Sequence, residues 1–195
     1  LSTNESINDI NQEDENNVQK ILFNHENEKV FILGDSMVKH VNGYLITKNI
    51  GHKCLVKVRA FRGAKIQCMD DYSRPTIREF DPEWIIIHVG TNDLNTEKTA
   101  SQISKSLIDF AHSLHNDSTK VAISLIIPRM NNLNNKATDV NDRLRIMCSE
   151  RNIPFIDHSD YIQTHLHIDE DKLHLSRCGT VALSQKFTKF ISKLY

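Results

Sequence analysis

Val30 to Leu33 form an uninterrupted run of four apolar residues, VFIL, which ends at Gly34, Asp35 and Ser36 just before a segment with helical spacing. A strand in a parallel sheet is apolar along its whole length, because helices cover both of its faces. We therefore expect a buried strand that turns into a helix at Ser36. Such a turn projects a side-chain oxygen from the carboxyl edge of the sheet, next to the free backbone N–H groups of the helix start.

The same turn also suits a purely structural role. Asp35 and Ser36 are both common helix N-caps, since their side-chain oxygens accept hydrogen bonds from the first backbone N–H groups of a helix. The turn by itself would favour this role, so the rest of the chain has to decide between the two interpretations.

Apolar runs and helical periods alternate along the remaining chain. Lys53 to Ala60 alternates apolar and polar residues, which predicts a strand with one exposed, basic face at the edge of a sheet. Trp84 to Val89, WIIIHV, is the most hydrophobic run and predicts a central strand, with further strands at Val121 to Ile127 and Pro154 to Asp157. Helical spacing predicts helices over about residues 37–48, 64–80 with a break at Pro75, 99–114, 137–147 and 183–194.

Strands that alternate with helices in this way form one parallel sheet with helices on both faces and right-handed crossovers. The expected fold is α/β: a three-layer α/β/α sandwich around a five-stranded parallel sheet, with its site at the carboxyl ends of the strands. A chain of 195 residues fits one such domain. Residues 1–20 are polar with few apolar side chains, so we expect a disordered tail or linker there and the domain at 21–195.

Composition limits the partners and the compartment. With 24 basic residues, 25 acidic residues and a net charge of -1, nucleic acid is not expected as a partner of this domain alone. The four cysteines form no CxxC pair, no apolar run approaches a membrane span, and no signal peptide is visible, which favours the cytoplasm.

One local group of cations departs from this balance, and we call it the basic cluster: Lys53, Lys57, Arg59, Arg62 and Lys65. It could contact an anionic substrate or a phosphate backbone. Charges that protect an edge strand against pairing with another strand are the favoured explanation.

Polar groups from several strand ends are expected at one edge of the sheet. Ser36, Gly63 and Asn92 follow the first three strands, and the motif DKLH, which contains Asp171 and His174, precedes the last helix. A hydroxyl such as that of Ser36 needs a base to become a nucleophile, and His174 can be that base if Asp171 orients its imidazole. The backbone N–H groups of Ser36 and Gly63 and the amide of Asn92 can donate hydrogen bonds to an oxyanion.

In order and spacing, these motifs resemble the four sequence blocks of the SGNH, or GDSL-type, hydrolases. The blocks are GDS at Gly34–Ser36, the isolated Gly63, GTND at Gly90–Asp93 and DKLH at Asp171–His174, and the resemblance covers roughly residues 28 to 194. Met37 stands where the family's name motif has leucine, and FRGA around Gly63 is the least distinctive block.

The resemblance implies a flavodoxin-like fold and a serine esterase that works without a cofactor or a metal ion. Ser36 would be the nucleophile, with His174 and Asp171 as its partners, and Ser36, Gly63 and Asn92 would form the oxyanion hole. The substrate would be a small-molecule or lipid ester, split through an acyl-enzyme. The run from GDSMVKH through HVGTNDL is also similar to SGNH domains carried in invertebrate retrotransposon reading frames and in uncharacterised animal proteins.

Three other functions remain open. The first is a catalytically weak or inert binding module that holds an anion at the same edge, within a larger nucleic-acid-associated protein, although anion binding has no use for DKLH. The second is a metal site in HLHIDEDKLH, whose spacing fits no standard zinc pattern: His165, His167, Asp169 and His174. The third is a nucleophilic Cys178, for which the neighbouring sequence offers no group that would stabilise a thiolate.

Overall fold

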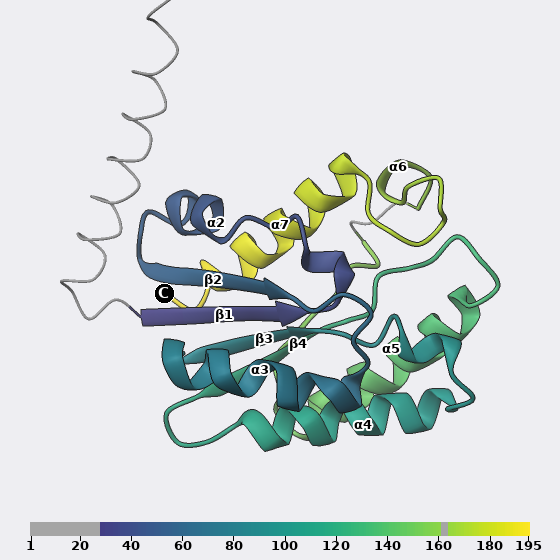
Figure 1. Ribbon diagram of the computed structural model, residues 1–195, viewed down its shortest axis with the longest axis horizontal. Coiled ribbons are helices and arrows are strands. Elements are labelled where there is room, and N and C mark those ends of the chain that lie inside the picture. The colour runs from purple at the N-terminus through teal and green to yellow at the C-terminus, as the bar shows by residue number, and fades with distance from the viewer. Residues whose placement is uncertain (1–27, 161–163) are drawn as a thin grey trace, which may run out of the picture.

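The computed structural model describes residues 28–160 and 164–195 and shows a five-stranded sheet (Figure 1). All neighbouring strands are parallel, and the strand order is β2-β1-β3-β4-β5. The strands are β1 (Glu28–Gly34), β2 (Cys54–Ala60), β3 (Trp84–His88), β4 (Lys120–Ser124) and β5 (Phe155–Ile156). The predicted α/β fold is confirmed, whereas the tail expected at residues 1–20 lies outside the described residues.

Helices cover the two faces of the sheet as the apolar runs predict. Figure 1 shows α2 and α7 on one face and α3, α4 and α5 on the other, which gives three layers. The helical elements, labelled as in the figure, are η1 (Ser36–Val38), α2 (Gly43–Asn49), α3 (Ile66–Phe80), η2 (Asp93–Asn95), α4 (Ala100–Leu114), α5 (Asn134–Glu150), α6 (Thr164–His167) and α7 (Arg177–Ile191).

The core is divided between these two faces. In β1, Phe31 and Leu33 pack into the cluster beneath α3, α4 and α5, whereas Val30 and Ile32 pack into the cluster beneath α2 and α7. All four side chains are completely buried. The uninterrupted apolar run of β1 is therefore explained by burial on both faces of the strand.

The single helix expected over residues 37–48 is wrong, because the segment contains two helical pieces. The 3-10 turn η1 ends at Val38, and α2 begins at Gly43 after Asn42, whose side chain accepts a hydrogen bond from the backbone N–H of Leu45 at 3.1 Å. A Cβ added at Gly43 would lie only 2.3 Å from the carbonyl oxygen of Val56. The glycine that weakens the helical pattern is thus what allows α2 to pack closely against β2.

The helix break expected at Pro75 is also wrong. α3 continues through Pro75 to Phe80. A proline inside a helix removes one hydrogen bond and crowds the carbonyl of the preceding turn, but this helix buries Met69, Ser73 and Thr76 on either side of Pro75. Packing against the sheet therefore outweighs the local cost of the proline.

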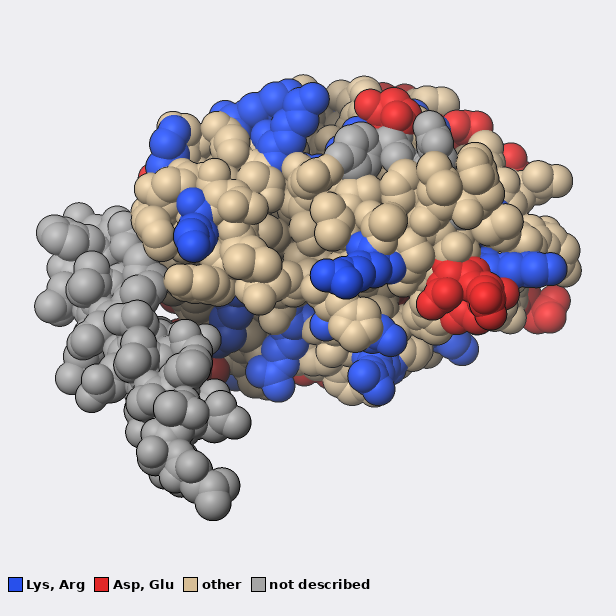
Figure 2. Space-filling model, turned by 90° about the horizontal axis from the view of Figure 1, so that it is seen from above, with Lys and Arg blue, Asp and Glu red and all other residues tan. Residues whose placement is uncertain are grey.

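β2 is an edge strand as expected, because it is the first strand in the sheet order. Of the basic cluster, Lys57 and Arg59 lie on β2, whereas Lys53 precedes the strand and Arg62 and Lys65 follow it. Two of its cations pack over aromatic rings: Lys57 Nζ lies 5.2 Å from the ring centre of Phe80, and the guanidinium of Arg59 lies 5.8 Å from that of Phe61. On the face above α2 and α7, Figure 2 shows Lys and Arg in separate groups with uncharged surface between them. Among the helices in the described ranges, none is long and apolar enough to cross a membrane.

Candidate active site

The turn after β1 contains two polar residues, Asp35 and Ser36, which have different partners. Asp35 is completely buried, and its Oδ1 accepts the backbone N–H of Met37 at 3.0 Å, so Asp35 is the N-cap of η1. A Cβ at Gly34 would lie 2.6 Å from the carbonyl oxygen of His88, which explains why only glycine fits where β1 and β3 end side by side. Because Asp35 supplies the cap, the Ser36 hydroxyl is left for another partner.

That partner is His174. Ser36 Oγ lies 3.1 Å from His174 Nε2, across 138 positions of sequence. On the other side of the ring, His174 Nδ1 lies 2.5 Å from Asp171 Oδ2. Since a carboxylate only accepts hydrogen bonds, Nδ1 carries the proton and Nε2 of the neutral ring presents its lone pair to the serine hydroxyl.

Asp171 is held as a carboxylate by its surroundings. Its Oδ1 accepts the backbone N–H groups of Leu173 at 2.9 Å and His174 at 2.8 Å. Burial raises the pKa of Asp171, but the hydrogen bonds from the His174 ring and from these backbone groups outweigh that effect and lower the pKa to about 2. Asp171 is therefore ionised at neutral pH and orients the imidazole.

The DKLH segment is a tight loop with several ties. Ile168 and Leu175 form an antiparallel bridge at its base, and the backbone N–H of Asp169 donates to the His174 carbonyl at 2.7 Å. Lys172 adopts a left-handed φ of 60°, and its carbonyl accepts the backbone N–H of Met130 at 3.2 Å. The loop is thereby fastened to the segment that follows β4.

Gly63 and Asn92, the other two candidate oxyanion donors, are linked through Ala64, the residue after Gly63. Gly63 has a φ of +71°, a conformation that favours glycine, and a Cβ there would meet no atom within 4 Å. The Asn92 side-chain amide donates to the carbonyl of the next residue, Ala64, at 3.0 Å. This bond fixes the plane of the amide and uses one of its two N–H donors, which leaves the second N–H for another acceptor.

Asp93 of GTND has a structural task that the sequence did not indicate. It is completely buried, and its Oδ2 accepts the backbone N–H of Ile66 at 3.1 Å. Lys65, the N-cap residue of α3, provides no side-chain cap of its own. Asp93 therefore caps α3 from a distant part of the chain, and burial raises the pKa of its carboxyl.

Two further buried polar groups lie near this edge, and sequence reasoning missed the burial of the first, Arg129. Arg129 is only 5% exposed and donates from Nη1 to the Thr91 carbonyl at 3.0 Å. Its place directly after the fourth strand and Pro128 was the available signal. The second group is a chain of buried side chains in which Ser124 Oγ lies 2.8 Å from His88 Nδ1 and 2.8 Å from His158 Nε2.

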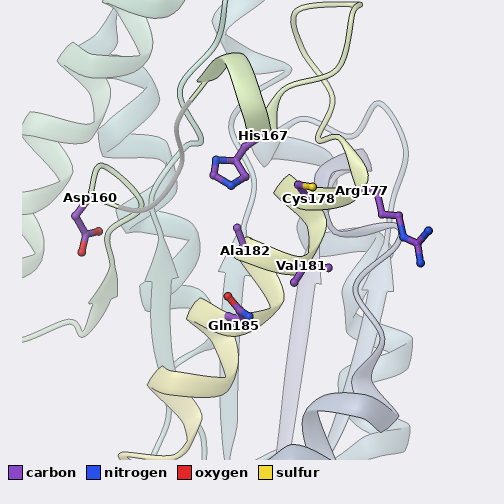
Figure 3. Close-up of a pocket in the computed structure, with 7 residues that line it drawn as sticks. All are labelled: Asp160, His167, Arg177, Cys178, Val181, Ala182 and Gln185. Carbon is purple, nitrogen blue, oxygen red and sulfur yellow. The ribbon is translucent and has the colours of Figure 1, made fainter.

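The metal and cysteine alternatives gain no support from the geometry. Within residues 28–160 and 164–195 no group of three or more His, Cys, Asp or Glu side chains could hold a metal ion. Cys178 is exposed and lines a cavity of about 550 Å³ on α6 and α7. Figure 3 shows the His167 ring beside Cys178 and the Arg177 side chain pointing away from it. Ser36 and His174 are not among the residues that line this cavity.

The chain is similar to known proteins in sequence and in fold. The sequence model described as the GDSL-like lipase/acylhydrolase family matches residues 32–180. Among curated proteins, no sequence matches the chain.

Several solved structures share the fold at low sequence identity. A GDSL-like lipase from Bacteroides thetaiotaomicron superposes with a TM-score of 0.68 at 14% identity, covering 86% of this chain and 89% of that one. The lipase/acylhydrolase from Enterococcus faecalis gives 0.69 at 16% identity, covering 85% and 96%. The psychrotrophic esterase EstA from Pseudoalteromonas sp., in a structure inhibited by monoethylphosphonate, gives 0.66 at 13% identity, covering 86% and 98%.

Proposed function

Because the chain belongs to the GDSL-like lipase/acylhydrolase family, we propose that it is a serine esterase that hydrolyses carboxylic esters through an acyl-enzyme on Ser36. The observation that carries the proposal is the continuous series of contacts from Ser36 Oγ through the His174 ring to Asp171. A binding site for an anion would not need a base aligned on a hydroxyl. Acyl transfer needs one, since a neutral hydroxyl is a weak nucleophile.

The proposed reaction has two halves that use the same groups. As Ser36 Oγ attacks the ester carbonyl carbon, His174 Nε2 takes the hydroxyl proton, and Asp171 stabilises the imidazolium. Collapse of the tetrahedral intermediate breaks the ester bond, and the alcohol leaves with the proton from His174. A water molecule then gives a proton to His174 and attacks the acyl carbon. As this second tetrahedral intermediate collapses, the bond between the acyl carbon and Ser36 Oγ breaks, the acid leaves, and His174 returns the proton to Ser36 Oγ.

The carbonyl oxygen of the substrate becomes negative in both halves. We assign its stabilisation to the backbone N–H groups of Ser36 and Gly63 and to the Asn92 side-chain amide. The hydrogen bond from Asn92 to the Ala64 carbonyl supports this role, because it holds the amide in one orientation beside the Gly63 turn. Donors that are already oriented need no reorganisation when the charge develops.

Two measurements test the proposal together. Hydrolysis of p-nitrophenyl esters of increasing acyl length would show activity and chain-length preference. A fluorophosphonate probe, matched to the phosphonate that inhibits the Pseudoalteromonas esterase, should label Ser36, as located by peptide mass spectrometry. Labelling at another residue, or none in a folded sample, would refute the assignment of the nucleophile.

We expect hydrolysis to fall in acid, because a protonated His174 can no longer accept the Ser36 proton. A pH series of kcat/KM with p-nitrophenyl acetate measures this. Addition of EDTA should leave the rate unchanged at every pH. A loss in EDTA that zinc restores would favour the metal interpretation of His165, His167 and Asp169 instead.

Replacing Asn92 with alanine should lower kcat by about 10²-fold while KM changes little, because an oxyanion donor acts only in the transition state. The unfolding free energy should fall by about 1 kcal/mol, since the hydrogen bond to Ala64 is lost as well. Asn116→Ala is a matched control, because Asn116 Oδ1 fastens a remote loop by accepting the backbone N–H of Thr119 at 2.9 Å. Equal turnover in both variants would remove Asn92 from the mechanism.

A further inference from the structure

Arg129 is a cation buried at the carboxyl edge of the sheet. Its guanidinium donates from Nη1 to the carbonyl of Thr91, within GTND, at 3.0 Å. Its Nε is also buried, and it has no hydrogen-bond partner among the residues that the structure describes. A buried cation that is incompletely paired costs stability, so packing alone is a poor explanation for an arginine here.

The backbone around Arg129 connects the two catalytic loops. The next residue, Met130, donates its N–H to the Lys172 carbonyl in DKLH, while the Arg129 side chain holds Thr91 in GTND. The backbone N–H of Arg129 itself donates to Asn134 Oδ1 at 2.8 Å, which anchors the segment to the start of α5. Arg129 therefore sits where β4, GTND and DKLH meet.

The charge of Arg129 acts on the carboxylates of the same edge. Burial lowers the pKa of Arg129, and the charges of Asp35 and Asp171 oppose that effect. The interaction is mutual, so a positive guanidinium favours the ionised forms of both carboxylates. Asp171 needs its charge to stabilise the imidazolium of His174.

We propose that Arg129 is a positioning residue of the esterase site, which holds GTND and DKLH in a fixed relation and supplies the positive charge that the Asp171–His174 pair requires. This inference rests on the proposed function. Arg129 acts through Thr91, Asp171 and Asp35 rather than by contact with the reacting atoms. It thus differs from the oxyanion donors, which act on the substrate directly.

Loss of the Arg129 charge should shift the pH dependence of hydrolysis in one defined direction. Removing a cation makes every neighbouring acid or base easier to protonate, and the reaction needs Asp171 ionised and His174 neutral. The acid limb of the kcat/KM profile should therefore move to higher pH when Arg129 loses its charge. The charged and titratable groups that act on the guanidinium at this edge, or on its neighbouring carboxylates, are Asp35, Lys65, Asp93, Lys98, Asp171 and His174.

The test compares Arg129→Met with Arg145→Met. Arg145 is the matched control because it also pairs with carboxylates, at 2.7 Å from Asp157 and 2.6 Å from Asp142, but on α5 away from Ser36. We expect Arg129→Met to lower kcat by about 10- to 100-fold with KM within about threefold, since small displacements of catalytic groups have effects of this size. The acid limb of the kcat/KM profile of Arg129→Met should move to higher pH. Arg129→Lys keeps the charge, so its acid limb should lie at the wild-type position.

The same comparison can also contradict the proposal. Loss of stability alone, with kcat and the acid limb as in Arg145→Met, would overturn the proposal. If Arg129→Met does not fold, Arg129→Gln removes the charge, keeps a donor for the Thr91 carbonyl, and is held to the same results.

A readout independent of turnover separates this proposal from the proposed function. The Nδ1–H proton of His174, in its short bond to Asp171, should give a low-field proton NMR signal in the wild-type protein. Arg129→Met should shift or lose this signal even if no ester is hydrolysed. An unchanged signal would refute the role of Arg129, whereas an inactive wild-type protein with the signal would refute only the esterase.

Discussion

We expect Ser36→Ala to lower kcat on p-nitrophenyl esters by about 10⁴-fold or more, the largest effect of any single substitution in this chain. The variant lacks the atom that forms the acyl-enzyme, so only binding and oxyanion stabilisation remain to accelerate direct attack by water. KM should change little, because the hydroxyl contributes more to the transition state than to binding. Steady-state kinetics at neutral pH measure both quantities.

The fold should survive this substitution. Asp35, not Ser36, caps η1, and within the described part of the chain the side chain of Ser36 hydrogen-bonds only to His174. Ser113→Ala is a suitable control, because Ser113 donates to the Phe110 carbonyl on α4, on the other side of the sheet. Equal unfolding midpoints with a 10⁴-fold difference in kcat would place the effect in chemistry, whereas an active Ser36→Ala would refute the nucleophile.

The sheet could be predicted from the sequence because its signals are local. β1 and β3 are buried on both faces, so each appears as one continuous apolar run, and the charged alternation of β2 identifies an edge strand. The carboxyl ends of parallel strands meet at one edge of the sheet. For this reason, Ser36 and His174 could be predicted to lie close together although they are far apart in the sequence. Their 3.1 Å contact follows from topology more than from any single motif.

The missed features depend on contacts between distant segments. No local pattern shows that Asp93 caps α3, that Gly43 makes room for the Val56 carbonyl, or that Arg129 is buried against Thr91. Propensity also failed at Pro75, where packing of the helix against the core outweighed one lost hydrogen bond. Sequence periodicity reports which face of an element is buried, but not which polar group on another element will satisfy its ends.

The buried chain His88–Ser124–His158 should make the protein sensitive to acid. His88 is 3% exposed and His158 is 1% exposed. Burial lowers the pKa of His88 to about 3, with His158 nearby as a further cause, and burial lowers the pKa of His158 to about 4. Both rings are therefore neutral in the native protein at pH 5, while the same rings in the unfolded chain are protonated below their ordinary pKa of 6.5.

The sign of the effect follows from proton binding. Between pH 6.5 and pH 5 the unfolded state binds more protons at these two positions than the native state, so the unfolding free energy falls as the pH falls. At about 1.4 kcal/mol per pH unit for each group, the two histidines together should remove about 4 kcal/mol between pH 7 and pH 5. Asp35 acts in the opposite direction, because burial raises its pKa to about 7 and its native form gains a proton over the same range.

Since these contributions oppose one another, the comparison of variants is the decisive measurement. His158→Gln and His88→Asn place an amide near the ring nitrogen that contacts Ser124 and cannot titrate in this range. Urea unfolding at pH 7 and pH 5 should show that each variant loses about 2 kcal/mol less than the wild-type protein. His40→Gln is the control, because the His40 side chain is exposed, whereas His88 and His158 are buried.

The outcome also tests whether the buried rings are neutral. If the two variants lose as much stability in acid as the wild-type protein, the rings bind protons in the native state and must have a counter-charge or water near Ser124. If only His158→Gln reduces the loss, His88 is the protonated member of the pair. In either case the acid fall of activity must be measured where the protein is still folded, because unfolding through His88 and His158 would otherwise also lower turnover.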